Sequence, residues 1–548
     1  MSRIGRITAT ENMPTTVDEF TFWLKNDVII GPFDIVRVKN ANNSVTFGIV
    51  KEISHITDSS GHLGDYVSHD FGDIETSSLT QRLGTTYVKS QVLSNDNDIF
   101  MPVPHGEIVE FASEDDVRKA LGLDNIKDEV PAGYLIMTNG TTVPICFDRN
   151  FLIGPEGAHL NISGISGLAT KTSYAMFMLQ ALQQKCADQV ALIILNVKGQ
   201  DLLKLNENNS DLSHADIDFW AKTGLTCKPF DKLKYFYPFH HGINSRHAAT
   251  YCDLISLECQ FDTNIGKTYV YTYEDDREKL DMLFSNIDDP NFTIESIMTA
   301  ISSDQEFTTL SNWDDFFQKL GQRSQAGGTH GKEIAVQSWR RFYRLIKTNI
   351  QSYKKGQFLF TNTINQKINN CRLEDEIKQI AGGDTYVVDI AKLSEHHQML
   401  VFGDIIRAVY DLKLVGRDEE GEDGPAIPNY IVIFVDELNK YAPVNAPKSS
   451  PLLRYLLEIS ERGRSMGIVL FSAEQFRSAV EDRVKGNCST QVYGRTNATE
   501  IAKSDYRYIP QTYKNTMTRL KKGDLLIDHP IFRTLLKLSF PMPSYRQK

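Results

Sequence analysis

The chain has 548 residues, of which 41% are hydrophobic, and a formal net charge of −11 at pH 7. It is too long for one ordinary domain and apolar enough for two or three packed units. The acidic balance excludes a protein that coats nucleic acid with its whole outer surface, because phosphate binding needs clustered Lys and Arg, but it leaves open a basic channel inside an acidic ring.

Membrane insertion and export are not supported by the sequence. No run approaches eighteen apolar residues, and residues 1–16 lack the apolar centre of a signal peptide. The seven cysteines are scattered without a C-x-x-C pair, so we expect reduced structural thiols. The expected location is the cytoplasm.

The first 110 or so residues predict a small β-barrel or β-sandwich. Short strand-like runs at 27–40, 44–54 and 85–93 are separated by Gly, Pro, Asn and Asp. This pattern is not that of a nucleotide-binding fold.

A different pattern of apolar residues begins near residue 158. Apolar strand-like runs at 159–164 and 190–199 alternate with a helical pattern at 172–187, which is typical of a parallel sheet. From about 275 to 380 the pattern is helical and polar, with apolar residues three and four apart, and this predicts a helical insertion.

Short buried strands return in the last third, at 385–391, 430–437, 467–473 and 489–495. The acidic, Gly- and Pro-containing run at 417–429 predicts a solvated surface loop. The predicted fold is therefore α/β: a RecA-like P-loop ATPase core with a mainly parallel sheet, an N-terminal small β-barrel and a helical insertion. The predicted boundaries are 1–115 for the barrel, 116–274 for the first part of the core, 275–380 for the insertion and 381–548 for the second part.

A strand, a Gly-containing turn and Lys171-Thr172 at the start of a helix predict a phosphate-binding loop. In such a loop backbone N–H groups and the helix N-terminus face the anion, while the Lys reaches the β and γ phosphates. The match to G-x-x-x-x-G-K-[ST] is imperfect, since Thr170 occupies the second Gly position and counting from Gly164 gives one extra residue. An ordinary strand–turn–helix junction is the alternative. The predicted nucleotide contacts are Gly164, Ser166, Gly167, Leu168, Ala169, Thr170, Lys171, Thr172 and Ser173.

The run 431–437 supplies the second half of the predicted site. A buried strand delivers Asp436 at its carboxyl end, where it can hold Mg²⁺, and Glu437 beside it can polarise the attacking water. We expect Thr172 to join Asp436 in binding Mg²⁺, with Ser173 as the competitor for that role or for helix capping.

Four further residues are candidates for contacts with the γ phosphate. Gln475, after the strand at 467–473, is either a γ-phosphate sensor or a surface residue. Arg462 or Arg464 is either an arginine finger reaching a neighbouring subunit's nucleotide or part of a surface ion pair. Arg495, which follows the next strand, is a second finger candidate.

Four sequence blocks resemble bacterial HerA-type ATPases of the HerA/FtsK superfamily. They are the loop G-x-S-G-L-A-T-K-T-S, the strand I-V-I-F-V-D-E-L-N-K-Y-A-P, the block E-R-G-R-S-M-G-I-V-L-F-S-A-E-Q and the ending H-P-I-F-R-T-L-L-K-L-S-F-P-M-P. The N-terminal strands, with G-I-V at 48–50 and P-V-P-H-G-E-I-V at 102–109, are similar to that family's HAS-barrel.

The resemblance implies an ATP-hydrolysing homo-hexameric DNA translocase or helicase. It also implies double-stranded DNA in the central channel and a docked effector, such as a NurA-like or other nuclease or a Sir2-type protein, in anti-phage defence or DNA processing. Two alternatives stay open: an ATP-binding ring scaffold that activates an effector with little translocation, and a nucleotide-independent structural protein. The cluster Trp339 to Arg344 mixes bases and aromatics as nucleic-acid surfaces do, but an amphipathic helix with a solvated basic face explains it more simply.

Overall fold

The computed structural model describes residues 2–59, 61–68, 71, 75, 83–165, 170–325, 334–350, 358–416 and 426–547. The chain divides into two compact units, and each is described by itself. The smaller unit comprises Met1–Phe147, Ile509–Thr516 and Leu525–Ser539. The larger comprises Asp148–Tyr508, Met517–Asp524 and Phe540–Lys548.

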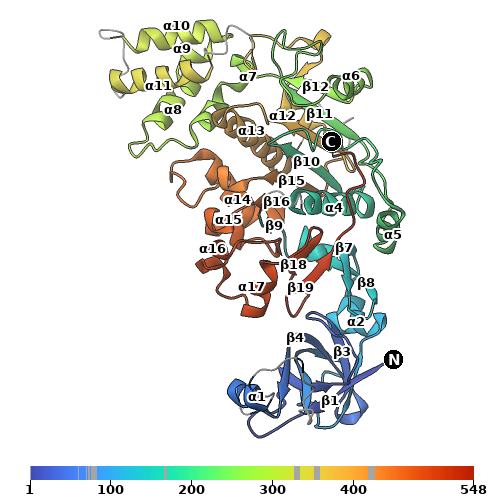
Figure 1. Cartoon of the computed structure of the whole chain (residues 1–548). Coiled ribbons are helices and arrows are strands. Elements are labelled where there is room, and N and C mark those ends of the chain that lie inside the picture. Colours follow the sequence, from blue (N-terminus) through green and yellow to red (C-terminus); the bar gives the residue numbers. More distant parts are fainter. Residues whose placement is uncertain are drawn as a thin grey trace. The chain divides into compact units, whose positions relative to one another are not determined.

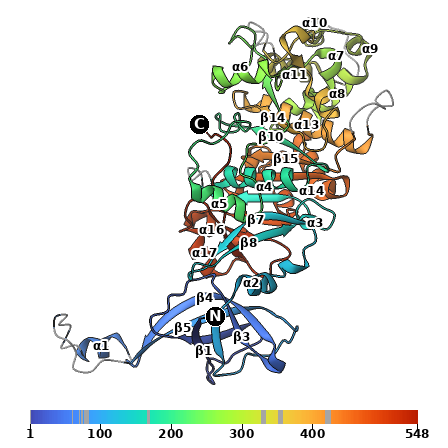
Figure 2. The same ribbon diagram turned by 90° about the vertical axis from the view of Figure 1, so that its right-hand side faces the viewer.

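The smaller unit contains a closed antiparallel barrel with the strand order β1-β2-β5-β4-β3-β6 (Figure 2). Its core consists of alternate apolar side chains, among them Phe20, Phe22, Val36 and Val109. Pairing of β1 with β6 closes the barrel, and this decides between the barrel and the sandwich that the sequence left open. Its strands are β1 (Arg3–Thr8), β2 (Glu19–Leu24), β3 (Ile35–Lys39), β4 (Val45–Thr57), β5 (Gly84–Asn95) and β6 (Ile108–Phe111).

Four further strands follow one another as neighbours in the order β18-β19-β7-β8. They are β18 (Asp524–Asp528), β19 (Leu536–Ser539), β7 (Glu129–Ile136) and β8 (Thr142–Asp148), and the sequence patterns had not indicated them. Helix α1 covers His62–Ser68, and α2 (Glu114–Leu121) begins at a capping box formed by Ser113 and Asp116.

In the residues that the structure describes, the larger unit is built on nine parallel strands in the order β13-β12-β11-β14-β10-β15-β16-β9-β17. Strands β10, β14 and β16 are buried along their whole length, as their Val, Ile and Leu content predicts. The bounds are β9 (Leu160–Ser163), β10 (Val190–Asn196), β11 (Leu233–Pro238), β12 (Gly266–Tyr269), β13 (Asn370–Cys371), β14 (Thr385–Asp389), β15 (Tyr430–Asp436), β16 (Ile468–Glu474) and β17 (Thr490–Tyr493).

The order of the five strands β17-β9-β16-β15-β10 defines the fold class. Strand β9, which leads into the predicted phosphate loop, is separated from β15, which carries Asp436, by the later strand β16. This is the strand order of RecA-like P-loop ATPase cores. With the barrel and the helices between β12 and β13, it confirms the predicted fold class.

Helices cover both faces of this sheet (Figure 1). Helix α4 (Thr170–Lys185) lies on one face and is buried on nearly all sides, while α13 (Glu395–Leu414) and α14 (Pro451–Met466) lie on the other. Among the described residues, no helix is long and apolar enough to cross a membrane. Outside the helical insertion, the remaining helices of the larger unit are α3 (Arg149–Leu152), α5 (His214–Lys222), α6 (Leu254–Asp262), α12 (Leu373–Lys378), α15 (Asp482–Gly486) and α16 (Ala498–Ile501), while α17 (Gln511–Met517) belongs to the smaller unit up to Thr516.

Local sequence explains why α14 begins and ends where it does. Ser450 caps its N-terminus by accepting a hydrogen bond from the Leu453 amide, and Pro451 occupies the first turn. Gly467 ends the helix in the left-handed region, at φ 71°. A Cβ there would lie 2.0 Å from the Asn429 carbonyl oxygen, so this position requires glycine.

The segment between β12 and β13 forms the helical insertion. Its helices are α7 (Tyr273–Asp276), α8 (Thr293–Ser303), α9 (Gln305–Thr308), α10 (Trp313–Arg323) and α11 (Val336–Asn349). On α11, Trp339 and Phe342 are buried whereas Arg340, Arg341 and Arg344 are exposed. The helix is therefore amphipathic, with a buried apolar face and an exposed basic face.

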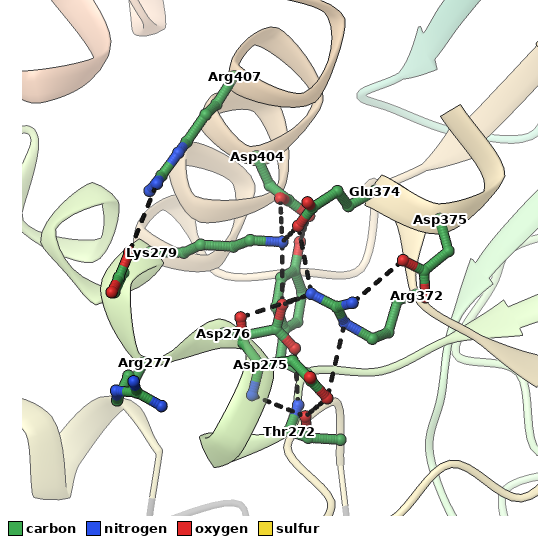
Figure 3. A network of polar contacts seen from close by, with 12 residues as sticks. Thr272, Asp275, Asp276, Arg277, Lys279, Arg372, Glu374, Asp375, Asp404 and Arg407 are labelled. Carbon is green, nitrogen blue, oxygen red and sulfur yellow. Dashed lines mark hydrogen bonds and ion pairs between the residues drawn. The ribbon is translucent and has the colours of Figure 1, made fainter. Parts of the chain in front are cut away.

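A cluster of buried charges ties the insertion to α12 and α13 (Figure 3). Lys279, in the 3-10 helix η3 (Arg277–Phe284), lies 2.9 Å from Asp276, 2.8 Å from Glu374 and 2.6 Å from Asp404. Arg372 contacts Asp276 at 3.1 Å and Glu374 at 3.2 Å. Burial acts to lower the pKa of the Lys279 ammonium, but the three carboxylates outweigh burial and raise it.

Replacement of Lys279 by Met should destabilise the larger unit, because it removes the cation paired with the buried Asp404, whereas Asp276 and Glu374 keep Arg372. We expect a loss of roughly 3–5 kcal/mol in the free energy of unfolding. The control is Arg483→Met, which breaks the exposed pair with Glu461 and should cost under about 1 kcal/mol. Denaturant unfolding of the two variants measures both values, and equal losses would contradict the prediction.

Candidate active site

The candidate residues lie at one edge of the nine-stranded sheet. Strands β9, β10, β15 and β16 are parallel, so their carboxyl ends meet at this edge. The edge brings together Lys171, Thr172, Asp436, Glu437 and Gln475. The predicted contacts Ser166, Gly167, Leu168 and Ala169 lie outside the described residues.

The turn after β9 is held between the two neighbouring strands. The Gly164 amide donates to the Glu474 carbonyl at 3.2 Å, and the Ile165 amide donates to the Arg495 carbonyl at 2.8 Å. Gly164 has φ +154°, and a Cβ on it would lie 3.1 Å from the Gly494 Cα and 3.2 Å from the Arg495 carbonyl oxygen. This close approach of two segments of the chain requires glycine at the start of the loop.

Lys171 lies in the first turn of α4 and is buried beside this turn. Its Nζ donates to the Gly164 carbonyl at 2.8 Å and to the Ile165 carbonyl at 3.2 Å. Burial lowers the pKa of the Lys171 ammonium, against the opposing charge of Asp436. Since carbonyl dipoles compensate a buried cation only in part, this ammonium is placed to bind an anion. Thr170, beside it, is also buried.

Thr172 and Ser173 point to different partners. The Thr172 hydroxyl donates to Asp436 Oδ2 at 3.2 Å, and Asp436 Oδ1 accepts from the Glu437 amide at 2.9 Å. The Ser173 hydroxyl instead accepts from Gln547 Nε2 at 3.2 Å. A hydroxyl and a carboxylate side by side are oxygen ligands of the kind that Mg²⁺ prefers. Of the two hydroxyls, that of Thr172 is the one beside a carboxylate.

Glu437 is held by two lysines, which the sequence analysis did not single out. Its Oε1 lies 3.3 Å from the Nζ of Lys198, and its Oε2 pairs with Lys440. Lys198 follows β10 and also lies 3.0 Å from Asp436 Oδ2. Burial acts to raise the pKa of the Glu437 carboxyl, but the hydrogen bonds and charges of Lys440 and Lys198 outweigh it and lower the pKa. The signal available in the sequence was the position of Lys198, a charged residue just after the apolar run of β10. That β10 pairs with β15 is seen in the structure.

Glu474, at the end of β16, is a third acid at this edge, after Asp436 and Glu437. The sequence analysis had selected its neighbour Gln475 instead. It is fully buried; its Oε2 accepts from Asn161 Nδ2 at 3.0 Å, and its Oε1 has no hydrogen-bond partner within the described part of the chain. Burial raises the pKa of the Glu474 carboxyl to about 7, while Arg477 acts in the opposite direction. The acid lies behind the turn that follows β9, where its backbone carbonyl accepts a hydrogen bond from the Gly164 amide.

The C-terminal segment forms one wall of the site. Its Phe540 packs on Tyr174 and Phe177 of α4, and its Ser544 bonds to Gln180 at 2.8 Å. With the Ser173 contact, this segment follows one face of the helix over two turns. A cavity of about 400 Å³ opens beside it and is lined by Ile165, Thr170, Lys171, Thr172, Ser173, Lys198, Asp201, Glu437, Gln475, Tyr545 and Gln547.

The arginines predicted as fingers do not reach this cavity within the chain. Arg462 and Arg464 lie in the last turn of α14, just before β16 begins, and hence at the opposite edge of the sheet from Asp436. Arg462 is 75% exposed and lies 3.8 Å from Glu458, while Arg464 donates to the Glu156 carbonyl at 2.8 Å. Gln475, in contrast, lines the cavity.

No family model and no curated protein matches the chain. Among solved structures, it is similar to an unbound form of the bacterial conjugative coupling protein TrwBΔN70, with a TM-score of 0.44, 11% identity and coverage of 80% of this chain and 94% of that one. It is also similar to the plasmid coupling protein TrwB in complex with ADP and Mg²⁺, with a TM-score of 0.41, 10% identity and coverage of 71% and 86%. A third is the genome packaging NTPase B204 from Sulfolobus turreted icosahedral virus 2 in complex with ATP-γS, with a TM-score of 0.22, 14% identity and coverage of 31% and 72%.

The chain has the RecA-like α/β fold that the sequence predicts, together with a closed N-terminal barrel. The strand order of the larger unit and the closure of the barrel carry this assignment. In this architecture the edge that holds Lys171 and Asp436 is the one on which P-loop proteins bind their ligands.

Removal of the Glu474 charge should stabilise the larger unit above neutral pH. The ordinary pKa of this carboxyl is 4.5 and its folded value is about 7, so the folded state holds a proton that the unfolded state has lost. The contribution of Glu474 to the free energy of unfolding therefore falls as pH rises from about 4.5 to 7, and it is constant above pH 7. Glu474→Gln removes this loss, and we expect a gain of roughly 2–3 kcal/mol at pH 8 that shrinks below about 1 kcal/mol at pH 5.

Denaturant unfolding of wild type and Glu474→Gln at the two pH values measures this difference. Gln475→Ala, at the neighbouring position without an ionisable group, is the control and should shift stability equally at both. A gain from Glu474→Gln that is the same at pH 5 and pH 8 would refute a raised pKa.

Proposed function

We propose that the larger unit binds ATP with Mg²⁺ and hydrolyses it, and that the protein acts as a ring-forming DNA translocase or helicase resembling HerA. The observation that carries the ATPase part is the Thr172–Asp436 hydrogen bond beside the buried ammonium of Lys171. A lysine and a hydroxyl at the start of one helix, with a carboxylate from the end of β15 beside them, fit a metal–triphosphate ligand.

Lys171 and the first turn of α4 would bind the phosphates. The ammonium is folded back onto two carbonyl oxygens, and an anion in the cavity would give it a charged partner instead. Thr172 and Asp436 would hold Mg²⁺ through their oxygens. The bound metal nucleotide supplies the terminal phosphoryl group that is transferred to water.

Glu437 is the group best placed to orient the attacking water and to accept its proton. It lies beside Asp436 at the end of β15 and lines the same cavity as Lys171. Gln475 lines this cavity too, which supports a role in sensing the γ phosphate.

The resemblance of the sequence supports a homo-hexamer with double-stranded DNA in its channel. An arginine finger would then come from a neighbouring subunit, and the exposed Arg462 or the nearby Arg464 are our candidates. The effector would be a NurA-like or other nuclease or a Sir2-type protein, in anti-phage defence or DNA processing.

A ring scaffold that activates an effector, with slow hydrolysis as a timer, is the second candidate. It is favoured by the pairing of both Glu437 oxygens with lysines, because a carboxylate held in this way is a weak proton acceptor. The unusual Thr170 in the loop favours it as well.

Steady-state ATP hydrolysis by the purified full-length chain, with and without double-stranded DNA and a candidate effector, tests the proposal. We expect Lys171→Ala to abolish hydrolysis and to weaken ATP binding. Glu437→Gln should keep ATP binding but lower kcat by about 10²-fold or more, because it removes the proton acceptor alone.

The three conditions separate the two candidates. Hydrolysis stimulated by DNA and lost in both variants supports the motor, whereas negligible turnover that rises only with the effector supports the scaffold. Wild-type protein that does not bind ATP with Mg²⁺ would refute both.

A further inference from the structure

One ammonium bridges the two acidic residues of the site. Lys198 Nζ lies 3.0 Å from Asp436 Oδ2 and 3.3 Å from Glu437 Oε1. The Asp436 side chain is 3% exposed and that of Glu437 14%, whereas Lys198 is 48% exposed. A half-exposed cation thus neutralises two nearly buried neighbouring carboxylates, which would otherwise repel each other.

The same contacts leave Glu437 poorly suited to act as a base. Lys198 pairs with one of its oxygens and Lys440 with the other. A proton acceptor must offer an oxygen within hydrogen-bond reach of the water that it activates. Each lysine takes one of these acceptor positions, and the departure of a lysine returns that position to a water.

The position of Lys198 also conflicts with metal binding. Asp436 Oδ2 accepts the Thr172 hydroxyl and pairs with Lys198, so the oxygen next to the candidate metal ligand Thr172 already carries a cation. An ammonium and a divalent cation at one oxygen repel each other. Lys198 must leave this oxygen before Asp436 and Thr172 can hold a metal together.

We propose that Lys198 is a positioning residue that locks Asp436 and Glu437 together and frees Glu437 when it gives way to the metal. Because one ammonium holds both carboxylates, its departure from Asp436 also loosens Glu437. Lys198 lines the cavity with Lys171, so its side chain can turn toward an anion there. The inference rests on the proposed ATP site, and it adds the group that couples metal binding to the activation of Glu437.

The chain offers a matched control. Lys440 pairs with Glu437 and is 43% exposed, close to the exposure of Lys198, but no contact joins it to Asp436 in the part of the chain described. Removal of either lysine takes away one positive charge near Glu437. Only the removal of Lys198 also frees Asp436 Oδ2.

The test is equilibrium binding of Mn²⁺ to the nucleotide-free full-length protein, with free Mn²⁺ measured by electron paramagnetic resonance. For Lys198→Met we expect binding tighter by roughly tenfold, because a like charge has left the site. For Lys440→Met we expect a gain below about threefold, since this charge lies farther from the metal ligands. Adding Asp436→Asn to Lys198→Met should abolish the gain, which would assign the metal to this site. Lys198→Arg, which keeps the charge, should bind Mn²⁺ as weakly as wild type.

Two results would overturn the lock: Mn²⁺ affinity unchanged in Lys198→Met, or an equal gain in Lys440→Met. The proposed ATPase stands or falls separately, on hydrolysis by the wild type and its loss in Lys171→Ala. A tenfold gain in Mn²⁺ affinity without wild-type hydrolysis would keep the lock and refute the ATPase. Hydrolysis by the wild type together with an unchanged Mn²⁺ affinity in Lys198→Met would keep the ATPase and refute the lock.

Discussion

The parallel arrangement of β9, β16, β15 and β10 is the constraint on which the site depends. Parallel strands end at one edge, so the residues that follow them meet there although they are far apart in sequence. Asp436 lies 264 residues from Thr172, and Lys198 lies 239 residues from Glu437. The apolar strands therefore determine which charges meet, and the loops and helix starts determine how those charges are oriented.

Burial acts on two ionisable groups of this edge in opposite directions. It lowers the pKa of the Lys171 ammonium and raises that of the Glu474 carboxyl to about 7, because desolvation disfavours the charged form of each. Asp436 and Glu437 have cationic partners instead, Lys198 for both and Lys440 for the second. The site thus holds an under-compensated cation at the helix start beside two acids that are paired with lysines, an arrangement suited to a ligand that carries its own cation.

Local signals in the sequence indicated the fold class and half of the site. Runs of Val, Ile and Leu predict buried strands. Lys171-Thr172 and Asp436-Glu437 follow two of these strands in the order expected of a P-loop ATPase, so the sequence alone places both pairs in one predicted site. Lys198 and Glu474 carry no motif, and their importance depends on which strands are neighbours. Crossover connections decide this, since β10 pairs with β15 across more than two hundred intervening residues. The Gln547–Ser173 contact joins residues 374 apart and is equally invisible to a local pattern.

The lysine lock changes how the weak phosphate-loop motif is to be interpreted. Thr170 in place of glycine and a bridging Lys198 both act on the resting site, and neither removes a group that hydrolysis requires. Lys171, Thr172, Asp436 and Glu437 are all present and adjacent, and Glu437 lies between two ammonium groups. A site that was simply inactive would have no need to keep its acids in reach of the cavity. Under the proposed function, the rate of hydrolysis would depend on how readily Lys198 gives way, and a ligand, a neighbouring subunit or an effector that displaces Lys198 would raise that rate.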